Sequence, residues 1–262
     1  RLMSQTPISF LGSWDTDSTV PQPSSRNPLK QTLAPEEPWD SPNPLSPSWE
    51  VDAFCWPEVV LKLQEVNTES MRRVSQHLAA SNRSGLKILA VTSGERGVGR
   101  STVSMHLARA ASQAGLKVAL VDADLQHPSL IDQLQIDAPN SWHQCITDGL
   151  PMDEAAVSSV EENIAIFPLT EPQPISMLQL HGMRMARFVE RLAKDYDLVI
   201  LDSCLLTKES TSLVGYETPA SLHAAIVVID SELSANDRLE DACCALKTMG
   251  IHSVGVVENF RP

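Results

Sequence analysis

Residues 88–124 constrain the fold more strongly than any other stretch of the chain. The apolar run Ile88 to Val91 predicts a buried strand, and the glycine-containing stretch Ser93 to Ser101 predicts a loop. A helical pattern then covers residues 102–114, and a second apolar strand at residues 118–121 leads directly into two aspartates. The order strand, loop, helix, strand predicts one βαβ unit.

The loop of this unit has the spacing of a phosphate-binding loop. Gly94 is followed, after four residues, by Gly99, Arg100 and Ser101, whereas the general pattern is Gly, four residues, Gly, Lys and Ser or Thr. Glycines allow backbone N–H groups to point at phosphate oxygens, and the positive end of the following helix adds to the attraction. We expect the nucleotide to be held by Gly94, Arg96, Gly97, Val98, Gly99, Arg100, Ser101 and Thr102.

Arg100 stands at the position where the pattern has Lys. The compact Lys cation reaches the β and γ phosphates, whereas the Arg guanidinium is bulkier and planar. We therefore expect nucleotide binding to survive the exchange more readily than fast phosphoryl transfer. Two alternatives stay open: the loop can be an ordinary glycine turn between a strand and a helix, and Arg96 can be a solvated surface charge.

Strands alternate with helices through the rest of the chain. The expected strands are residues 163–168, 196–201, 224–230 and 253–258, and the expected longer helices are residues 175–194, interrupted near Gly182, and 237–249. This alternation predicts an α/β fold of the P-loop NTPase type, which is a doubly wound, mostly parallel sheet with helices on both faces. Ligands of such sheets bind beyond the carboxyl ends of the strands.

Polar side chains follow several of these strands. Asp122 and Asp124 follow the second strand, Asp202 ends the strand at 196–201, and Asn259 follows the last one. Carboxylates so placed can bind Mg²⁺ and orient a nucleophile, so we expect Ser101, Asp122 and Asp202 at the metal and Arg100, Asp122 and Asp124 in catalysis. The alternative for each Asp is a turn or a cap. Asn259 can read an adenine edge or be a turn residue.

The composition changes along the chain. Ten of the 18 prolines lie at or before Pro57, and no periodicity lasts in that part, so we expect residues 1–56 to be a disordered tail. Residues 57–84 then read as a linker helix and residues 85–262 as the nucleotide-binding domain. The tail carries Trp14, Trp39, Trp49 and Trp56, which either anchor an unknown partner or pack back onto the domain.

Net charge and cysteine content limit the possible partners and the cellular compartment of the protein. A net charge of −13 disfavours nucleic acid as a partner, because proteins that bind nucleic acid need a basic surface. The five cysteines show no metal-ligand spacing, and we interpret them as reduced thiols. Neither a membrane span nor a secretory signal is expected from the pattern, so the prediction is a cytoplasmic protein.

The motifs resemble those of the bacterial tyrosine kinases that control exopolysaccharide synthesis, within the deviant P-loop group of partitioning and cell-division-positioning ATPases. The similarity covers roughly residues 65–262 and rests on residues 89–130 and on YDLVILDS at 196–203. It implies ATP and Mg²⁺ as cofactors. It also implies a membrane-protein activator of polysaccharide export, which would recruit this cytoplasmic chain to the inner face of the cell membrane.

The chain departs from the kinase pattern at several positions. Gln126 stands where the kinases have Arg, and Leu205 where they have Pro. Glu95 occupies the position of the extra signature Lys of partitioning ATPases. Tyr196 and Tyr216 are the chain's two tyrosines, and they form no terminal cluster of the kind that the kinases autophosphorylate.

Three functions stay open from the sequence. The first is a kinase-like phosphotransferase or ATPase with attenuated activity. The second is a partitioning-type ATPase switch, which forms a homo-oligomer with nucleotide. The third is a non-catalytic nucleotide-binding scaffold, whose tail recruits other proteins.

Overall fold

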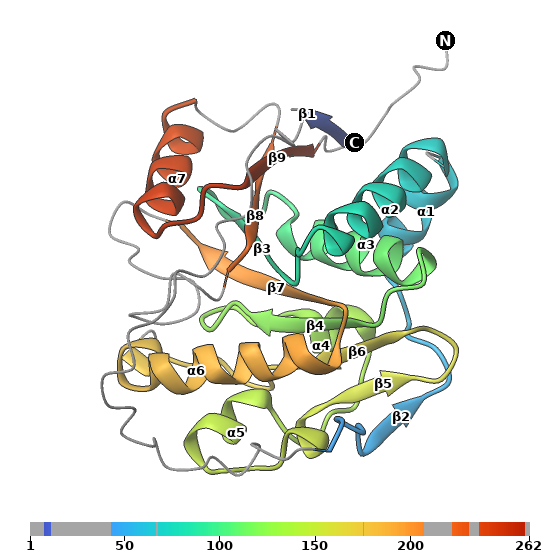
Figure 1. Ribbon diagram of the computed structural model, residues 1–262, viewed down its shortest axis with the longest axis vertical. Helices are drawn as coiled ribbons and strands as arrows, with labels where there is room; N and C mark the ends of the chain where they lie inside the picture. The colour runs from blue at the N-terminus through green and yellow to red at the C-terminus, as the bar shows by residue number, and fades with distance from the viewer. Residues whose placement is uncertain are drawn as a thin grey trace.

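The computed structural model describes residues 8–11, 43–66, 68–174, 176–206, 222–230 and 236–259. Within these ranges, nine strands form a single sheet (Figure 1). The strands are β1 (Ile8–Leu11), β2 (Trp49–Val51), β3 (Ile88–Ser93), β4 (Val118–Ala123), β5 (Val157–Ser159), β6 (Ile164–Phe167), β7 (Leu198–Leu205), β8 (Ala224–Asp230) and β9 (Val254–Asn259). The helices are α1 (Glu58–Val66), α2 (Thr68–Arg83), α3 (Arg100–Gln113), α4 (Leu130–Leu134), α5 (Trp142–Thr147), α6 (Ser176–Asp195) and α7 (Asn236–Thr248), with a short 3-10 helix at Met152–Ala155.

Six parallel strands form the centre of the sheet, in the order β9-β8-β3-β7-β4-β6. Every residue of β3, β4 and β6 is buried. Continuous apolar runs are typical of strands that are covered on both faces, and this is why these segments were readable in the sequence. The predicted doubly wound α/β fold is confirmed.

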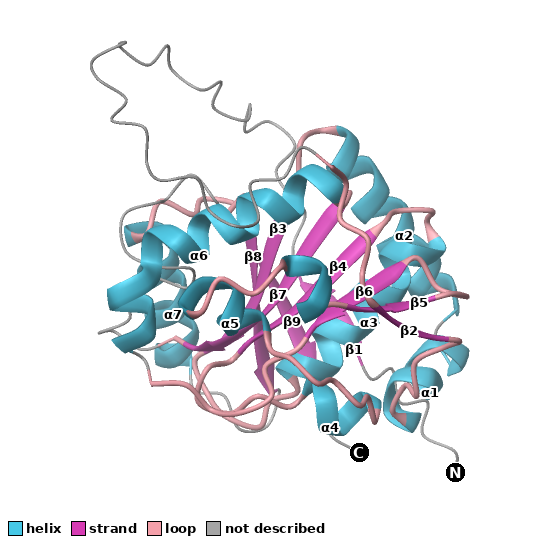
Figure 2. Cartoon of the chain, turned by 90° about the horizontal axis from the view of Figure 1, so that it is seen from below, coloured by secondary structure: helices cyan, strands magenta, loops and turns pink. Residues whose placement is uncertain are grey.

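Helices cover both faces of the sheet (Figure 2). Buried residues of α1, α2, α3 and α4 form one apolar layer with one face of the central strands. Buried residues of α5, α6 and α7 form the other layer. In this arrangement the carboxyl ends of the central strands β3, β4 and β7 lie side by side, and the loop after β3 lies at the same end of these strands.

The expected linker helix and the expected break in the helix at 175–194 both have structural counterparts. The segment 57–84 forms two helices, α1 and α2, and residue 67 between them lies outside the described residues. Inside α6, His181 has the non-helical angles φ −121° and ψ 16°, one residue before Gly182. None of the helices in the described ranges has the length and apolar character needed to cross a membrane.

The structure differs from the sequence expectation at residues 43–56, which we call the N-terminal strap. Its strand β2 pairs in parallel with β5 at the sheet edge, and its Phe54 and Trp56 are buried against the layer of α1 to α3. The Trp56 indole N–H donates to Glu162 Oε1 at 2.6 Å, and the Arg109 guanidinium lies 5.3 Å from the Trp56 ring centroid. Of the two interpretations of the tryptophans, packing on the domain therefore describes Trp56, while Trp14 and Trp39 lie outside the described residues.

β1, further towards the N-terminus, pairs antiparallel with β9 and forms the opposite edge of the sheet. Together with β2 and β5, it adds three short strands to the six that the sequence pattern predicted. Each of the three has four residues or fewer, so their periodicity is too short to be recognised in a sequence.

Candidate functional site

The loop between β3 and α3 is held in place by the last strand of the sheet. Gly99 adopts a positive φ of 91° directly before α3, a conformation that favours glycine. A side chain at Gly99 would also overlap the amide nitrogen of Asn259. That nitrogen donates a hydrogen bond to the Val98 carbonyl oxygen at 2.9 Å. Asn259 thus contacts the backbone of the loop, and both it and Gly99 are required for this close approach.

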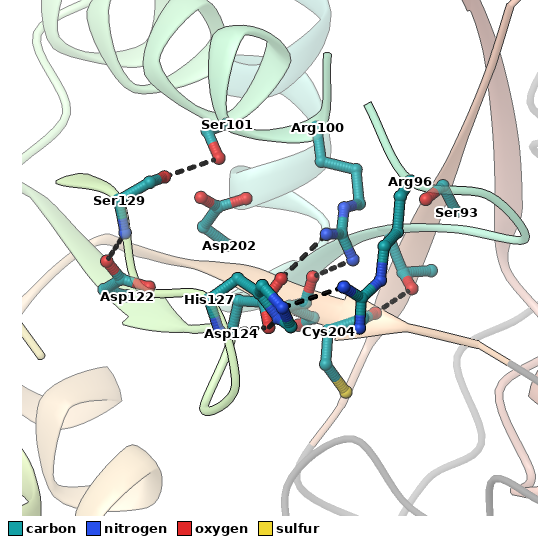
Figure 3. A network of polar contacts seen from close by, with 12 residues as sticks. Ser93, Arg96, Arg100, Ser101, Asp122, Asp124, His127, Ser129, Asp202 and Cys204 are labelled. Carbon is teal, nitrogen blue, oxygen red and sulfur yellow. Dashed lines mark hydrogen bonds and ion pairs between the residues drawn. The ribbon is translucent and has the colours of Figure 1, made fainter. Parts of the chain in front are cut away.

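Arg100 begins α3, and its guanidinium points towards the ends of two neighbouring strands (Figure 3). Nη2 donates to Asp124 Oδ2 at 2.7 Å, and Nη1 donates to the backbone carbonyl of Ser203 at 3.0 Å. The Arg100 and Asp124 side chains are only 13% and 10% exposed, so their ion pair is largely shielded from solvent. Two donors in a fixed fork allow Arg to make both bonds at once.

Asp122 and Asp202 are direct neighbours in the register of β4 and β7. Asp122 Oδ2 accepts the backbone N–H groups of Ser129 and Leu130 at 2.8 and 3.0 Å, and Asp202 Oδ1 accepts the Ser104 hydroxyl at 3.0 Å. Both side chains are buried. Their second oxygens, Asp122 Oδ1 and Asp202 Oδ2, have no hydrogen-bond partner among the described residues.

Burial raises the pKa of both carboxyl groups. For Asp122, burial is the largest cause and the neighbouring charge of Asp202 the second. For Asp202, burial again raises the pKa, and the nearby Ser101 hydroxyl and Arg100 charge oppose that rise. Two buried carboxylates side by side disfavour the doubly ionised state unless a cation lies between them or beside them.

The site fits a hard divalent cation such as Mg²⁺, which prefers oxygen ligands. The orphaned oxygens of Asp122 and Asp202 and the hydroxyl of Ser101 lie in one region (Figure 3). The Ser101 Oγ lies 3.1 Å from Ser129 Oγ, and Ser129 also donates its backbone N–H to Asp122. Within the described residues, His, Cys, Asp and Glu form no group of three that could hold a metal by themselves, so hydroxyl and phosphate oxygens or water would complete the ligand set.

Arg96 and His127 form a second pair beside the first. Arg96 Nη1 lies 2.8 Å from His127 Nε2, and the backbone N–H of His127 donates to Asp124 Oδ1 at 3.2 Å. His127 therefore joins the loop to Asp124, although no metal-ligand spacing marks it in the sequence. Gly97 has a positive φ of 74°, and Thr102 lies in the first turn of α3.

Some residues of the site carry no sequence signal that we could have used. Ser104 and Ser129 support the two buried carboxylates, and both come from stretches that read as an ordinary helix and an ordinary turn. Trp142 is fully buried, and its indole N–H donates to the backbone carbonyl of Asp122 at 2.7 Å. Trp142 lies at the first position of α5, and its ring centroid is 5.6 Å from that of Phe188 on α6. Two helices thus support the end of β4.

A family model for ParA, described as the NUBPL iron-transfer P-loop NTPase, matches residues 86–261. The chain belongs to this family. Its members bind nucleotide and Mg²⁺ in general, and the matched residues include the whole site described above. The chain is therefore a P-loop NTPase of the ParA type.

Curated relatives agree with this assignment. The chain is 30% identical over 185 residues to the cytosolic Fe–S cluster assembly factor nubp2 of Xenopus laevis. The aligned region covers 68% of this chain and 68% of the relative. It is 29% identical over 188 residues to the cytosolic Fe–S cluster assembly factor NUBP2 of Gallus gallus, covering 69% of this chain and 68% of the relative.

Solved structures with the same fold include two different subfamilies. The BceF tyrosine kinase domain gives a TM-score of 0.64 at 20% identity, covering 78% of this chain and 82% of that one. The septum site-determining protein MinD of Pyrococcus horikoshii, in complex with Mg-ADP, gives a TM-score of 0.52 at 23% identity, covering 64% of this chain and 68% of that one. These similarities concern the fold alone.

The expected membership in the bacterial tyrosine kinases is wrong, because the family model and the curated relatives point to the NUBPL family instead. The resemblance rested on the phosphate loop, on the Asp-x-Asp at the end of β4 and on Asp202 in β7. These motifs indicated the nucleotide-binding fold correctly and did not separate its subfamilies. The expected membrane-protein activator and the link to polysaccharide export rested on that resemblance and lose their basis with it.

Proposed function

We propose that this chain is an ATP- and Mg²⁺-dependent NTPase that acts as a nucleotide-driven factor in iron–sulfur cluster assembly in the cytosol. The observation that carries the nucleotide part is the buried pair Asp122 and Asp202, with two orphaned oxygens, beside Ser101 at the end of the phosphate loop. The relatives named as cytosolic Fe–S cluster assembly factors support the cellular part.

In this proposal, the backbone N–H groups of residues 94–102 and the N-terminus of α3 hold the phosphates. Arg100 exchanges Asp124 for phosphate oxygens, and Arg96 adds a second positive charge at the rim of the loop. Asn259 holds the loop rather than the adenine, because its amide nitrogen already bonds the Val98 carbonyl. Ser101, Asp122 and Asp202 hold Mg²⁺, whose positive charge would offset the charge that develops on the phosphates.

Hydrolysis then requires that water attack the γ phosphorus while the bond to the β–γ bridging oxygen breaks. Asp122 would accept the proton that the water releases, and the backbone N–H groups of Ser129 and Leu130 hold its carboxylate in a fixed orientation. Asp124, once released by Arg100, would orient the water through its own oxygens. Ser104 and the Ser129 N–H keep the two buried carboxylates in position.

The cysteines of this chain do not suit a cluster held by one copy alone. Fe–S clusters are bound by several Cys thiolates. Cys145 is buried, and burial raises its pKa to about 12, which disfavours the thiolate that binds iron. Within the described residues, no three His, Cys, Asp or Glu side chains gather as a metal-binding group. We therefore treat iron and sulfide as cargo and derive no step on a cluster bound within this chain.

A second candidate is a scaffold that binds nucleotide without turning it over. The observation that favours it is the largely buried bond between Arg100 and Asp124, which occupies the cation of the loop. The scaffold and the enzyme differ only in turnover, so one experiment distinguishes them.

That experiment is a calorimetric titration of the chain with Mg·ATP, followed by a long phosphate-release assay on the same sample. We expect binding and slow release in the wild-type chain, loss of release in Asp122→Asn, and loss of Mg²⁺-dependent affinity in Ser101→Ala. Binding without any release would support the scaffold. Unchanged release in Asp122→Asn would refute its catalytic role, and a chain that binds no nucleotide would overturn the proposal.

The assembly role needs a separate readout. We would measure the transfer of iron and sulfide from a cluster-loaded donor to an apo-ferredoxin, under anaerobic conditions and with the chain present. The proposal expects Mg·ATP to accelerate this transfer with the wild-type chain and not with Ser101→Ala. A transfer rate that is the same with and without Mg·ATP would overturn the assembly role and leave the NTPase assignment intact.

A further inference from the structure

Glu95 places a negative charge inside a loop that binds anions. It lies directly after Gly94, and its side chain is only 14% exposed. The Ser93 hydroxyl donates to the Glu95 backbone carbonyl at 2.5 Å, which fixes the backbone of Glu95. A carboxylate this close to the phosphate region repels a nucleotide unless a cation offsets it.

The cation that faces Glu95 comes from a distant part of the chain. Arg238, in the first turn of α7, places its Nε 3.2 Å from Glu95 Oε1. The backbones also meet here, because a Cβ atom added to Gly94 would lie 2.9 Å from the Arg238 carbonyl oxygen. Glycine at position 94 therefore allows α7 to approach the loop closely enough for the ion pair to form.

We infer that Arg238 is a positioning residue for nucleotide binding, which sets the net charge of the phosphate loop through Glu95. This inference rests on the proposed function, because it concerns the affinity of the same site for nucleotide. Arg238 offsets the charge of Glu95, so Glu95 does not cancel the positive charges of Arg96 and Arg100 beside the phosphates. Helix α7 thereby becomes part of the electrostatics of a site that the motif alone assigns to β3 and α3.

The exposed fraction of Arg238 sets the size of the effect. Its side chain is 60% exposed, so the pair is partly screened and contributes at the level of a surface ion pair. An electrostatic role has two signatures that a packing role lacks. The change in affinity grows with the charge of the ligand, and it shrinks as the salt concentration rises.

The test is a charge cycle on the full chain with Arg238→Gln, Glu95→Gln and the double variant. The dissociation constants of ATP, ADP and AMP, all without Mg²⁺, are measured by calorimetry at low and at high salt, with thermal unfolding as a check of folding. We expect Arg238→Gln to weaken ATP binding by about fivefold at low salt, because it leaves Glu95 unpaired. Glu95→Gln removes the repulsive charge and strengthens binding by about threefold. The double variant is close to the wild type.

The direction of the affinity change in each variant, and its dependence on the nucleotide, decide whether the inference holds. Losses that decrease from ATP to ADP to AMP, and that fade at high salt, support the inference. If all three variants lose affinity alike, α7 acts only through packing and the inference is overturned. If Arg238→Gln binds the nucleotides with the affinity of the wild type, the ion pair does not affect binding, and the inference is again overturned. A wild-type chain that binds no nucleotide refutes the proposed function itself, which is a result that the variants cannot mimic.

Discussion

Arg100 and Asp124 form a hydrogen-bonded ion pair of 2.7 Å at the position where a phosphate loop carries the cation that meets the nucleotide. Asp124 thereby competes with phosphate for the same guanidinium. Replacing Asp124 by Asn removes that competition and keeps the shape of the side chain. We expect Asp124→Asn to bind Mg·ATP about tenfold more tightly, because hydrogen bonds to charged groups are worth roughly 1.5–3 kcal/mol. Calorimetry measures this directly.

Phosphate release by Asp124→Asn should fall at the same time, because a water-orienting carboxylate is lost. His127→Gln is a matched control, since it changes a side chain that contacts Arg96 and leaves the Arg100 pair intact. Weaker binding by Asp124→Asn would show that Asp124 holds Arg100 in a productive position rather than competing for it.

Arg100→Lys tests the unusual residue of the loop. A Lys ammonium is compact and cannot make the two divergent bonds that Arg100 makes to Asp124 and Ser203. It is therefore freer to follow the phosphates, and we expect phosphate release to rise roughly tenfold. Arg100→Gln, which removes the charge, should abolish release. Equal release rates in the wild type and Arg100→Lys would indicate that chemistry is not the limiting step.

Trp142→Phe tests the support beneath the site. The substitution keeps a ring against Phe188 and removes the N–H that bonds the Asp122 carbonyl. We expect a loss of about 1 kcal/mol in the free energy of unfolding and a lower kcat at nearly unchanged KM. Trp56→Phe also removes an indole hydrogen bond, but far from Asp122, and its kcat should be that of the wild type. A kcat loss of equal size in both variants would reduce Trp142 to a general structural role.

Glu162 is the main polar anchor of the N-terminal strap. It accepts hydrogen bonds from the Trp56 indole and the Phe54 backbone, and it lies 3.9 Å from Arg109. We expect Glu162→Ala to accelerate protease cleavage within residues 43–56 and to lower the free energy of unfolding by about 1–3 kcal/mol. The exposed neighbour Glu161 supplies the matched control, Glu161→Ala. Identical cleavage of the two variants would mean that the strap is held by its apolar contacts alone.

His106 makes the stability of the folded chain depend on pH. It is 7% exposed, and burial lowers its pKa to about 4, with the charge of Arg109 as a second cause. The unfolded chain has a His pKa near ~6.5 and binds the proton first, so stability falls as the pH drops through this window. Between pH 7 and pH 5 we expect a loss of about 2 kcal/mol from this group.

His106→Leu should remove that part of the loss in urea unfolding at the two pH values. His252→Leu, at an exposed position, should not. The comparison between variants is needed because the raised pKa values of Asp122 and Asp202 act in the opposite direction, favouring the folded state on acidification. A wild-type loss that persists in His106→Leu would place the acid sensitivity elsewhere.

The sequence predicted the parts of the fold that local patterns encode. The unit β3, loop, α3 and β4 was readable because buried parallel strands are continuous apolar runs and the phosphate loop has fixed spacing. The convergence of Arg100, Ser101, Asp122, Asp124 and Asp202 followed from the rule that parallel strands end at one edge. The structure brings these five residues together, while their chemical roles remain predictions.

The strap could not be predicted, because its Pro- and Ser-rich composition is typical of disorder. What orders it is a set of bonds to residues more than a hundred positions away, such as the one from Trp56 to Glu162. The pair Glu95 and Arg238 is also invisible in the sequence, because Arg238 belongs to no motif and nothing in the phosphate loop indicates that α7 approaches Glu95. Long-range contacts of this kind have no local periodicity, and only the folded chain shows them.

The bond between Val98 and Asn259 joins residues 161 positions apart. During synthesis the ribosome therefore makes the phosphate loop long before the strand that fixes it. The loop can reach its final shape only after β9 has docked beside β8, when the central sheet is complete. Nucleotide binding should consequently appear late in refolding and report the finished domain, which makes it a natural signal that the newly made chain has matured.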